Sequence, residues 1–161
     1  MFGQEELWRY REDNRLEFKE AQGGLPRSFW ETYSSFANTQ GGLIVLGAAE
    51  KSDGTMRAIG VANLEALKRD LWNGLNNEQK VSTNLLLDSD ITQESIDGKS
   101  LLLVYVPRAD RTLRPVYIND NPKRGSFRRN GDGDYHCTAE ELRAMARDSA
   151  EGATDKLVLP A

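Results

Sequence analysis

The sequence predicts an α+β domain in which a mixed, mainly antiparallel sheet packs with about three helices. One observation is the entirely apolar run 43–46, which is bounded by glycines and is typical of a strand covered on both faces. Another is the preceding stretch 28–37, where aromatic and small residues recur at helical spacing. A third is the hairpin-type turn at 51–54, after which the chain returns as an antiparallel strand. One helix that leads directly into one buried strand is therefore the centre of the predicted fold.

Shorter elements are predicted on either side of this centre. Residues 5–9 are expected to form a helical turn. Residues 16–19 alternate apolar and charged side chains, which suits a half-buried strand. Residues 55–59 form the returning strand, and Asn63 is predicted to cap a helix over residues 64–75.

The second half of the chain is predicted to hold four further strands and a closing helix. The strands are residues 85–91, 100–106, 115–118 and 126–129. Residues 129–137 are interpreted as a glycine-rich turn, and Thr138–Glu141 has the residues of a capping box that opens the last helix. We expect residues 1–150 to form one domain. Residues 151–161 are expected to be a tail that begins a linker to a further domain.

Composition excludes several classes of protein. The formal net charge is −4, which argues against a protein that coats nucleic acid nonspecifically. Cys137 is the single cysteine and His136 the single histidine, so an intramolecular disulfide, a cysteine-based zinc site and a multi-histidine site are ruled out. No apolar run reaches the roughly 18 residues of a membrane span, and no signal peptide is recognisable. We therefore expect a cytoplasmic protein with no membrane association.

A first candidate site consists of carboxylates and a lysine near the predicted strand at 16–19. Glu17 and Lys19 are two residues apart, so a strand places both side chains on one face. Many metal-dependent nucleases use such a pair to hold Mg²⁺ or Mn²⁺ and contact phosphate, and Glu12 and Glu50 could complete the set. The alternative is a solvent-facing strand edge with ordinary Glu–Lys pairing.

A second candidate site is a basic stretch near the end of the chain, where only Asp110 and Asp120 oppose the positive charge. Tyr117 and Phe127 are interleaved with the cations, which is the composition of a nucleic-acid contact surface. The alternative is a solvated arm whose arginines pair with neighbouring carboxylates. The predicted nucleic-acid-binding residues are Arg108, Arg111, Arg114, Lys123, Arg124, Arg128 and Arg129.

Four blocks of the chain resemble a known family. Residues 12–20 resemble the E-x4-E-F-K opening of the Schlafen-type AlbA_2 domain, and residues 36–47 resemble its FANT-x-GG-x-hhhG block. Residues 115–118 and 127–131 are similar to the later PVY and Y-x-R-x-G elements. The blocks occur in the family's order and together cover about residues 10–147, so the combined pattern is far more specific than any one of them.

The resemblance implies a single α+β lobe that serves as a DNA-binding module in bacterial regulators. In animal Schlafen proteins two such lobes form a horseshoe that cleaves structured RNA with three acidic residues and a divalent metal. Carried over by position, the acids and metal ligands are Glu12, Glu17 and, most nearly, Glu50, where the nuclease form has aspartate. A single lobe is expected to pair with a second copy as a homodimer.

Three functions stay open at this point. The first is a Mg²⁺- or Mn²⁺-dependent endoribonuclease that acts on structured RNA such as tRNA, with Glu12, Glu17 and Glu50 on the metal and Lys19 at the scissile phosphate. The second is a non-catalytic DNA- or RNA-binding and dimerisation module of a bacterial transcriptional regulator. The third is a domain that mainly dimerises and transmits a signal.

Overall fold

The computed structural model describes residues 4–157 and has an α+β architecture. Its helices are α1 (Gln4–Glu12), α2 (Ser28–Asn38), α3 (Leu64–Leu75) and α4 (Ala139–Leu157), with a 3-10 turn η1 (Asp88–Asp90). Its strands are β1 (Leu16–Lys19), β2 (Gly42–Leu46), β3 (Ala48–Glu50), β4 (Met56–Ala58), β5 (Ile91–Ile96), β6 (Lys99–Val106), β7 (Phe127–Asn130) and β8 (Gly133–His136). The predicted fold class is confirmed, and α1 is the helix beyond the three that were expected.

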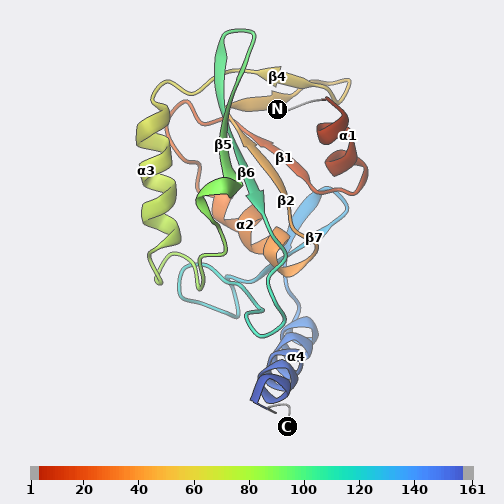
Figure 1. The fold of residues 1–161 in the computed structure, drawn as a ribbon. Helices are drawn as coiled ribbons and strands as arrows, with labels where there is room; N and C mark the ends of the chain where they lie inside the picture. Colours follow the sequence, from red (N-terminus) through yellow and green to blue (C-terminus); the bar gives the residue numbers. More distant parts are fainter. Residues whose placement is uncertain (1–3, 158–161) are drawn as a thin grey trace.

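The central sheet has the strand order β1-β2-β6-β5. Only β1 and β2 run parallel, and the other neighbours are antiparallel, so the sheet is mixed and mainly antiparallel as predicted. Two hairpins, β3–β4 and β7–β8, stand apart from it as two-stranded sheets. In Figure 1 the two hairpins lie on different sides of the sheet, and α4 extends away from the body of the domain.

The step from α2 into β2 depends on Gly41, the residue just before β2. Gly41 has φ +73, and its N–H donates to the carbonyl of Phe36 at 2.7 Å, which ends the helix. A Cβ on Gly41 would lie 2.6 Å from the carbonyl oxygen of Val106, so only glycine lets the chain pass this close to the end of β6. The helix and buried strand predicted from sequence are therefore joined as expected.

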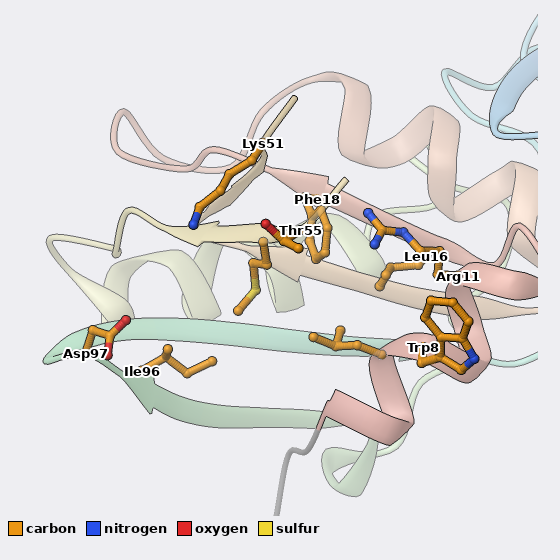
Figure 2. Close-up of a pocket in the computed structure, with 10 residues that line it drawn as sticks. Trp8, Arg11, Leu16, Phe18, Lys51, Thr55, Ile96 and Asp97 are labelled. Carbon is orange, nitrogen blue, oxygen red and sulfur yellow. The ribbon is translucent and has the colours of Figure 1, made fainter. Parts of the chain in front are cut away.

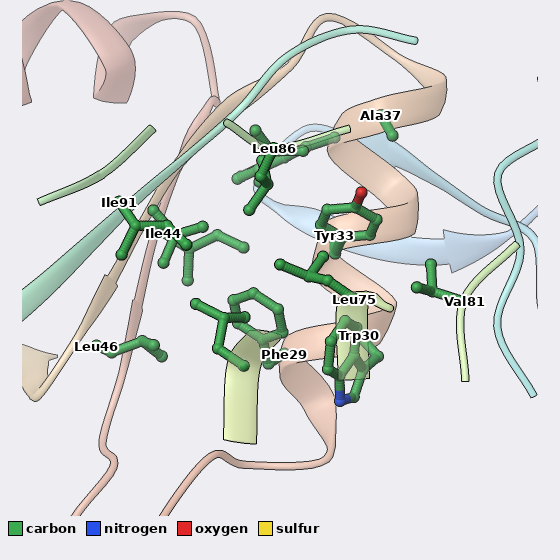
Figure 3. Packing of buried hydrophobic residues seen from close by; sticks show 14 of the residues in the cluster. Phe29, Trp30, Tyr33, Ala37, Ile44, Leu46, Leu75, Val81, Leu86 and Ile91 are labelled. Carbon is green, nitrogen blue, oxygen red and sulfur yellow. The ribbon is translucent and has the colours of Figure 1, made fainter. Parts of the chain in front are cut away.

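One face of the sheet carries the main core (Figure 3). Phe29 and Tyr33 of α2 pack here against Ile44 of β2, and Leu71 of α3 belongs to the same buried cluster. The Tyr33 hydroxyl donates to the carbonyl of Thr83 at 3.0 Å and accepts from the Leu85 N–H at 2.9 Å. Burial raises the pKa of Tyr33, so this hydroxyl stays neutral and fixes the loop that precedes β5.

The other face of the sheet is covered only in part. Leu43 and Val45 of β2 and Leu101 and Leu103 of β6 form a smaller buried cluster there. Its cover consists of side chains from α1 and from the β3–β4 hairpin, namely Leu7, Tyr10, Met56 and Ala58. Because successive residues of a strand alternate between faces, β2 is buried on both sides.

Two of the predicted strands are replaced by irregular backbone. The strand predicted at 85–91 begins only at Ile91, because the Asn84 and Asp90 side chains accept from the backbone N–H groups of Leu86 and Leu87 and form a local turn. The segment 115–118 makes only isolated bridges. There the Asn38 side chain bonds both the N–H and the carbonyl of Val116 and takes the place of a neighbouring strand.

One further element differs from the prediction: residues 129–137 form the β7–β8 hairpin where a turn alone was predicted. Gly47, with φ +98, separates β2 from β3, so Glu50 ends the first strand of the β3–β4 hairpin. Helix α4 continues past residue 150 to Leu157, and the division of the chain into a domain and a tail stays a prediction. The predicted tail beyond residue 157 lies outside the described residues.

Candidate nucleic-acid interface

Glu17 faces an arginine that is built into the fold. Arg129 of β7 donates from Nη1 to Glu17 Oε1 at 3.1 Å and to Asp134 Oδ1 at 3.0 Å. The same guanidinium donates to the carbonyl of Leu16 at 3.1 Å and, from Nε, to the carbonyl of Asn14 at 2.9 Å. Arg129 therefore ties the β7–β8 hairpin to β1 and to the turn before it.

Arg129 is also enclosed. Its guanidinium carbon lies 4.9 Å from the centre of the Phe36 ring, and its side chain is 5% exposed. Four polar partners and an aromatic face leave this residue little surface for a phosphate. Arg129 was predicted to contact nucleic acid, and its side chain takes part in this network of contacts within the domain.

Lys19 lies beside Glu17, as the strand spacing predicts. Its Nζ is 3.7 Å from Glu17 Oε2 and donates to Ser28 Oγ at 3.0 Å, at the start of α2. Across the same network, Thr32 Oγ1 of α2 donates to Asp134 Oδ2 at 2.6 Å. The Glu17–Lys19 pair thus forms part of the contacts that join α2, β1 and the β7–β8 hairpin.

The three predicted metal ligands do not gather at one point. Glu50 accepts from Arg11 Nη2 at 2.9 Å. It shares a pocket of about 270 Å³ with Glu17, whereas Glu12 lines a different pocket beside Trp8. The pocket that contains Glu17 and Glu50 is lined by Arg11, Asn14, Leu16, Glu17, Phe18, Glu50, Arg129 and Asp132. Within residues 4–157 no three Asp, Glu, His or Cys side chains are grouped to hold a metal ion.

Three of the predicted cations lie close together in the loop after β6. Burial lowers the pKa of Arg114, and the neighbouring charges of Arg108 and Arg111 lower it further. Asp148 of α4 and Asp110 act in the opposite direction. Among residues 4–157 the buried Nε of Arg114 has no hydrogen-bond partner. We name Arg108, Arg111 and Arg114 the arginine cluster.

Helix α4 packs on the loop that holds the arginine cluster. Ser149 Oγ donates to the carbonyl of Thr112 at 3.0 Å. Gly152 is buried, and a Cβ there would lie 2.9 Å from Arg111 Nε, so the helix has a notch where this arginine crosses it. In Figure 1 the loops between β6 and β7 lie at the end of the domain from which α4 extends.

Lys123 and Arg124 are exposed on a tight loop between β6 and β7. The Asn121 side chain accepts from the Arg124 N–H at 3.1 Å, and the Asn121 carbonyl accepts from the Gly125 N–H at 2.6 Å. Ser126 Oγ donates to the carbonyl of Pro122 at 2.6 Å. These bonds fix the turn, so the two cations are presented on an ordered backbone.

The aromatic residues near the basic stretch differ in their exposure. Phe127 is 6% exposed and its ring centre lies 4.4 Å from that of His136, and Tyr117 is half-buried. Tyr135 of β8 is instead 53% exposed. Sequence reasoning missed Tyr135 because 129–137 was interpreted as a turn; the alternation at 133–136 is the signal that could have revealed a strand.

An apolar groove of about 630 Å³ lies over the partly covered face of the sheet (Figure 2). Trp8 and Arg11 of α1 stand at one end of it, and Ile96 and Asp97 stand at the other, beside the β5–β6 turn. Trp8 is 60% exposed. Glu17 and Lys19 belong to the opposite face of the sheet, since their register partners Ile44 and Leu46 lie in the main core.

The fold is a small α+β module whose arginine-bearing loops lie at the end from which α4 extends. The model of the Schlafen AlbA_2 family matches residues 12–138. The chain therefore belongs to the Schlafen AlbA_2 family. A search among curated proteins found no match. Within the described part of the chain, no helix has the length and apolar character needed to cross a membrane.

Two solved structures are similar to this domain. One is the N-terminal domain of a protein related to the ATP-dependent DNA helicase RecG, from Nitrosomonas europaea, with 30% identity, a TM-score of 0.58, and coverage of 83% of this chain and 90% of that one. The other is the DIP2311 protein from Corynebacterium diphtheriae, with 21% identity, a TM-score of 0.57 and coverage of 84% of this chain. This chain spans 24% of the Corynebacterium protein, and that likeness concerns the fold alone.

Proposed function

We propose that this domain is a nucleic-acid-binding module whose contact surface is formed by the loops between β6 and β7. The observation that carries the proposal is the arginine cluster. Burial is the main cause of the lowered pKa of Arg114, and the charges of Arg108 and Arg111 lower it further, although the carboxylates of Asp148 and Asp110 act in the opposite direction. A phosphate among these side chains would offset the repulsion and give the Arg114 Nε a partner.

The charge of the whole chain supports a selective contact. The protein is acidic overall, with a formal net charge of −4, so its basic loops are a local feature and not part of a uniformly cationic surface. Lys123 and Arg124 extend the positive potential beyond the arginine cluster. The similar Nitrosomonas domain comes from a protein related to a DNA helicase, which agrees with a nucleic-acid partner.

Metal-dependent RNA cleavage is a second candidate, favoured by one observation: Glu17 and Glu50 line the same pocket. The donor set does not fit a divalent cation in this arrangement. Glu17 is bound by Arg129 and Glu50 by Arg11, and Glu12 lines another pocket. Mg²⁺ and Mn²⁺ prefer several carboxylate or water oxygens without competing cations. We therefore derive no catalytic step at these residues.

Salt-dependent binding to DNA and RNA, compared between the wild type and two variants, tests the proposed function. Arg108→Glu reverses one exposed charge of the arginine cluster, and Arg69→Glu makes the same change on the exposed side of α3. We expect Arg108→Glu to weaken binding and to reduce the slope of log K against log salt by about 1. Arg69→Glu should bind like the wild type. Equal binding by all three proteins, or no binding at any salt concentration, would refute the proposal.

A denaturing gel separates the two candidate functions. The wild type is incubated with tRNA and with duplex DNA in Mn²⁺ or in EDTA. The binding module predicts intact nucleic acid in both, together with a salt-sensitive shift on a native gel. Cutting that requires Mn²⁺ would establish the nuclease instead. The expected homodimer also belongs to this proposal, and light scattering at several protein concentrations checks it.

A further inference from the structure

The two faces of the β7–β8 hairpin differ in burial: the inner face holds buried side chains, although His136 on it is exposed, and the outer face is the more open one. Its register pairs Arg129 with Asp134 and Phe127 with His136 on the inner face, and Arg128 with Tyr135 on the outer face. Phe127 and Arg129 are buried, as described above. The outer face therefore presents a cationic and an aromatic side chain directly opposite each other, at the short cross-strand distance of an antiparallel pair.

The exposed Tyr135 ring lies over Gly133. A Cβ on Gly133 would lie 2.9 Å from Tyr135 Cε2 and 3.2 Å from its hydroxyl oxygen, so the ring crosses the position that a side chain would fill. The backbone of Gly133 does not require glycine, because its φ is not in the left-handed region. Glycine is needed because any side chain would collide with the Tyr135 ring. A ring that lies over a glycine on one side and is 53% exposed leaves an aromatic surface open for stacking.

Arg128 has hydrogen-bonding capacity to spare. Its Nε lies 3.0 Å from Glu141 Oε1, yet this nitrogen makes no well-aligned hydrogen bond within residues 4–157. The Glu141 carboxylate is committed to its own helix, because Oε1 also accepts from the Thr138 N–H at 2.7 Å and completes the capping box of α4. Arg128 is thus loosely paired and 30% exposed, beside an open aromatic ring.

From this juxtaposition we propose that the outer face of the β7–β8 hairpin binds an unpaired nucleotide, whose base stacks on Tyr135 and whose phosphate binds Arg128. The inference rests on the proposed nucleic-acid-binding function and makes it specific. Bases in a regular duplex have no open faces, so a stacking platform selects single strands, loops and bulges. The chemistry is shared by RNA and DNA, since every base has a π-face.

Binding of matched single strands and duplexes tests the inference. The ligands are a 12-nucleotide single strand, made as RNA and as DNA, and the blunt duplex of the same DNA. Tyr135→Ala should weaken binding of the single strands by about 5- to 150-fold and leave duplex binding unchanged. Tyr135→Phe keeps the ring and should bind like the wild type. Trp8→Ala removes another exposed aromatic side chain, from α1 and not from the hairpin, and should also have no effect.

Glu141→Gln tests the role of Arg128. Glutamine can serve the capping box as glutamate does, so the helix start is kept while the competing charge is removed. We expect tighter binding of both single strands. If the 2′-hydroxyl takes part, the gain is larger with RNA; equal gains indicate contacts to base and phosphate only, and both results agree with the inference.

The failure of this inference can be told apart from failure of the proposed function. If Arg108→Glu weakens binding but Tyr135→Ala binds single strands as tightly as the wild type, the basic loops bind nucleic acid and the hairpin does not. An equal loss on single strands and duplex in Tyr135→Ala would also overturn the stacking role. Circular dichroism of each variant confirms that its fold is intact, and a wild type that binds none of the ligands refutes both proposals.

Discussion

Asn38 shows how much of this fold depends on a single buried side chain. Its amide nitrogen donates to the carbonyls of Val116 and Phe127, both at 2.9 Å, and its oxygen accepts from the Val116 N–H at 2.8 Å. Ser34 adds a second bridge between α2 and the same two segments. The side chain of Asn38, at the end of α2, therefore makes hydrogen bonds to backbone groups that would otherwise need a neighbouring strand as their partner.

Asn38→Ala should destabilise the protein strongly. The substitution removes three buried hydrogen bonds, those of the Val116 N–H and of the carbonyls of Val116 and Phe127, of which the Val116 carbonyl keeps a bond from Ser34 Oγ; we expect a loss of about 3 kcal/mol in the free energy of unfolding. Urea unfolding followed by circular dichroism measures it. The matched control is Asn73→Ala on the exposed side of α3, which should change stability by less than about 0.5 kcal/mol. Equal stability of the two variants would show that Asn38 is dispensable.

At the scale of elements, the β7–β8 hairpin is fastened by the contact between Arg129 and Glu17. The pair joins a hairpin near the end of the domain to an edge strand near its beginning, 112 residues apart in sequence. Since Arg129 is almost fully buried, a lost partner leaves a charge in a poorly solvated place. Asp134 provides a second carboxylate for Arg129, so the loss of stability on removing Glu17 is smaller than for an arginine with one partner.

Glu17→Gln should therefore lower the free energy of unfolding by about 2 kcal/mol, between the cost for a surface pair and that for a fully buried one. Glu20→Gln, an exposed change next to the same strand, is the control and should be neutral. Thermal or urea unfolding of both variants checks this. A Glu17→Gln protein as stable as the wild type, but deficient in Mn²⁺-dependent cutting, would show instead that Glu17 belongs to a metal site.

The elements of the main core could be predicted from sequence because their signals are local. The apolar run at 43–46 and the Asn63 cap, whose Oδ1 accepts from the Ala66 N–H, are each set by neighbours in the chain. The segment 115–118 was wrongly expected to be a strand. The Val116 N–H in this segment donates to the side chain of Asn38, which is 78 positions away in sequence. A partner so distant cannot be predicted from the local sequence pattern.

For the candidate interface, too, local features could be predicted from the sequence, whereas features that depend on contacts between distant residues could not. The basic stretch was visible as composition, but composition does not tell which cation is exposed. Arg128 and Arg129 are adjacent on one strand and so point to opposite faces, and only the packing of the hairpin decides that Arg129 is enclosed. The role of Glu12, Glu17 and Glu50 as metal ligands stays a prediction, made from the spacing of Glu17 and Lys19 and from a family resemblance.

At the scale of the whole molecule, stability should fall in alkaline solution because of Cys137. Burial raises the pKa of this thiol to about 11, and the nearby Glu141 carboxylate adds to the effect. The unfolded chain loses the thiol proton at its ordinary, lower pKa, whereas the folded chain keeps it. Between the two pKa values the unfolded state binds fewer protons, so the free energy of unfolding decreases as pH rises.

The comparison of wild type with Cys137→Ala isolates this contribution from the ionisation of tyrosines. We expect the difference in melting temperature between pH 8 and pH 10.5 to be larger for the wild type than for the variant. Below the ordinary pKa of a thiol the two curves should run parallel. Parallel curves over the whole range would mean that the thiol is not shielded from solvent as the structure indicates.

The position of Cys137 also makes its thiol a probe of local opening in the folded protein. It lies between β8 and α4, its N–H donates to the carbonyl of Ser126 at 2.8 Å, and it is the single thiol of the chain. An alkylating reagent can reach it only when the junction opens, so the rate of labelling under native conditions reports how often the hairpin and the helix part. A ligand that holds this junction closed will slow the labelling, even where it changes no other signal.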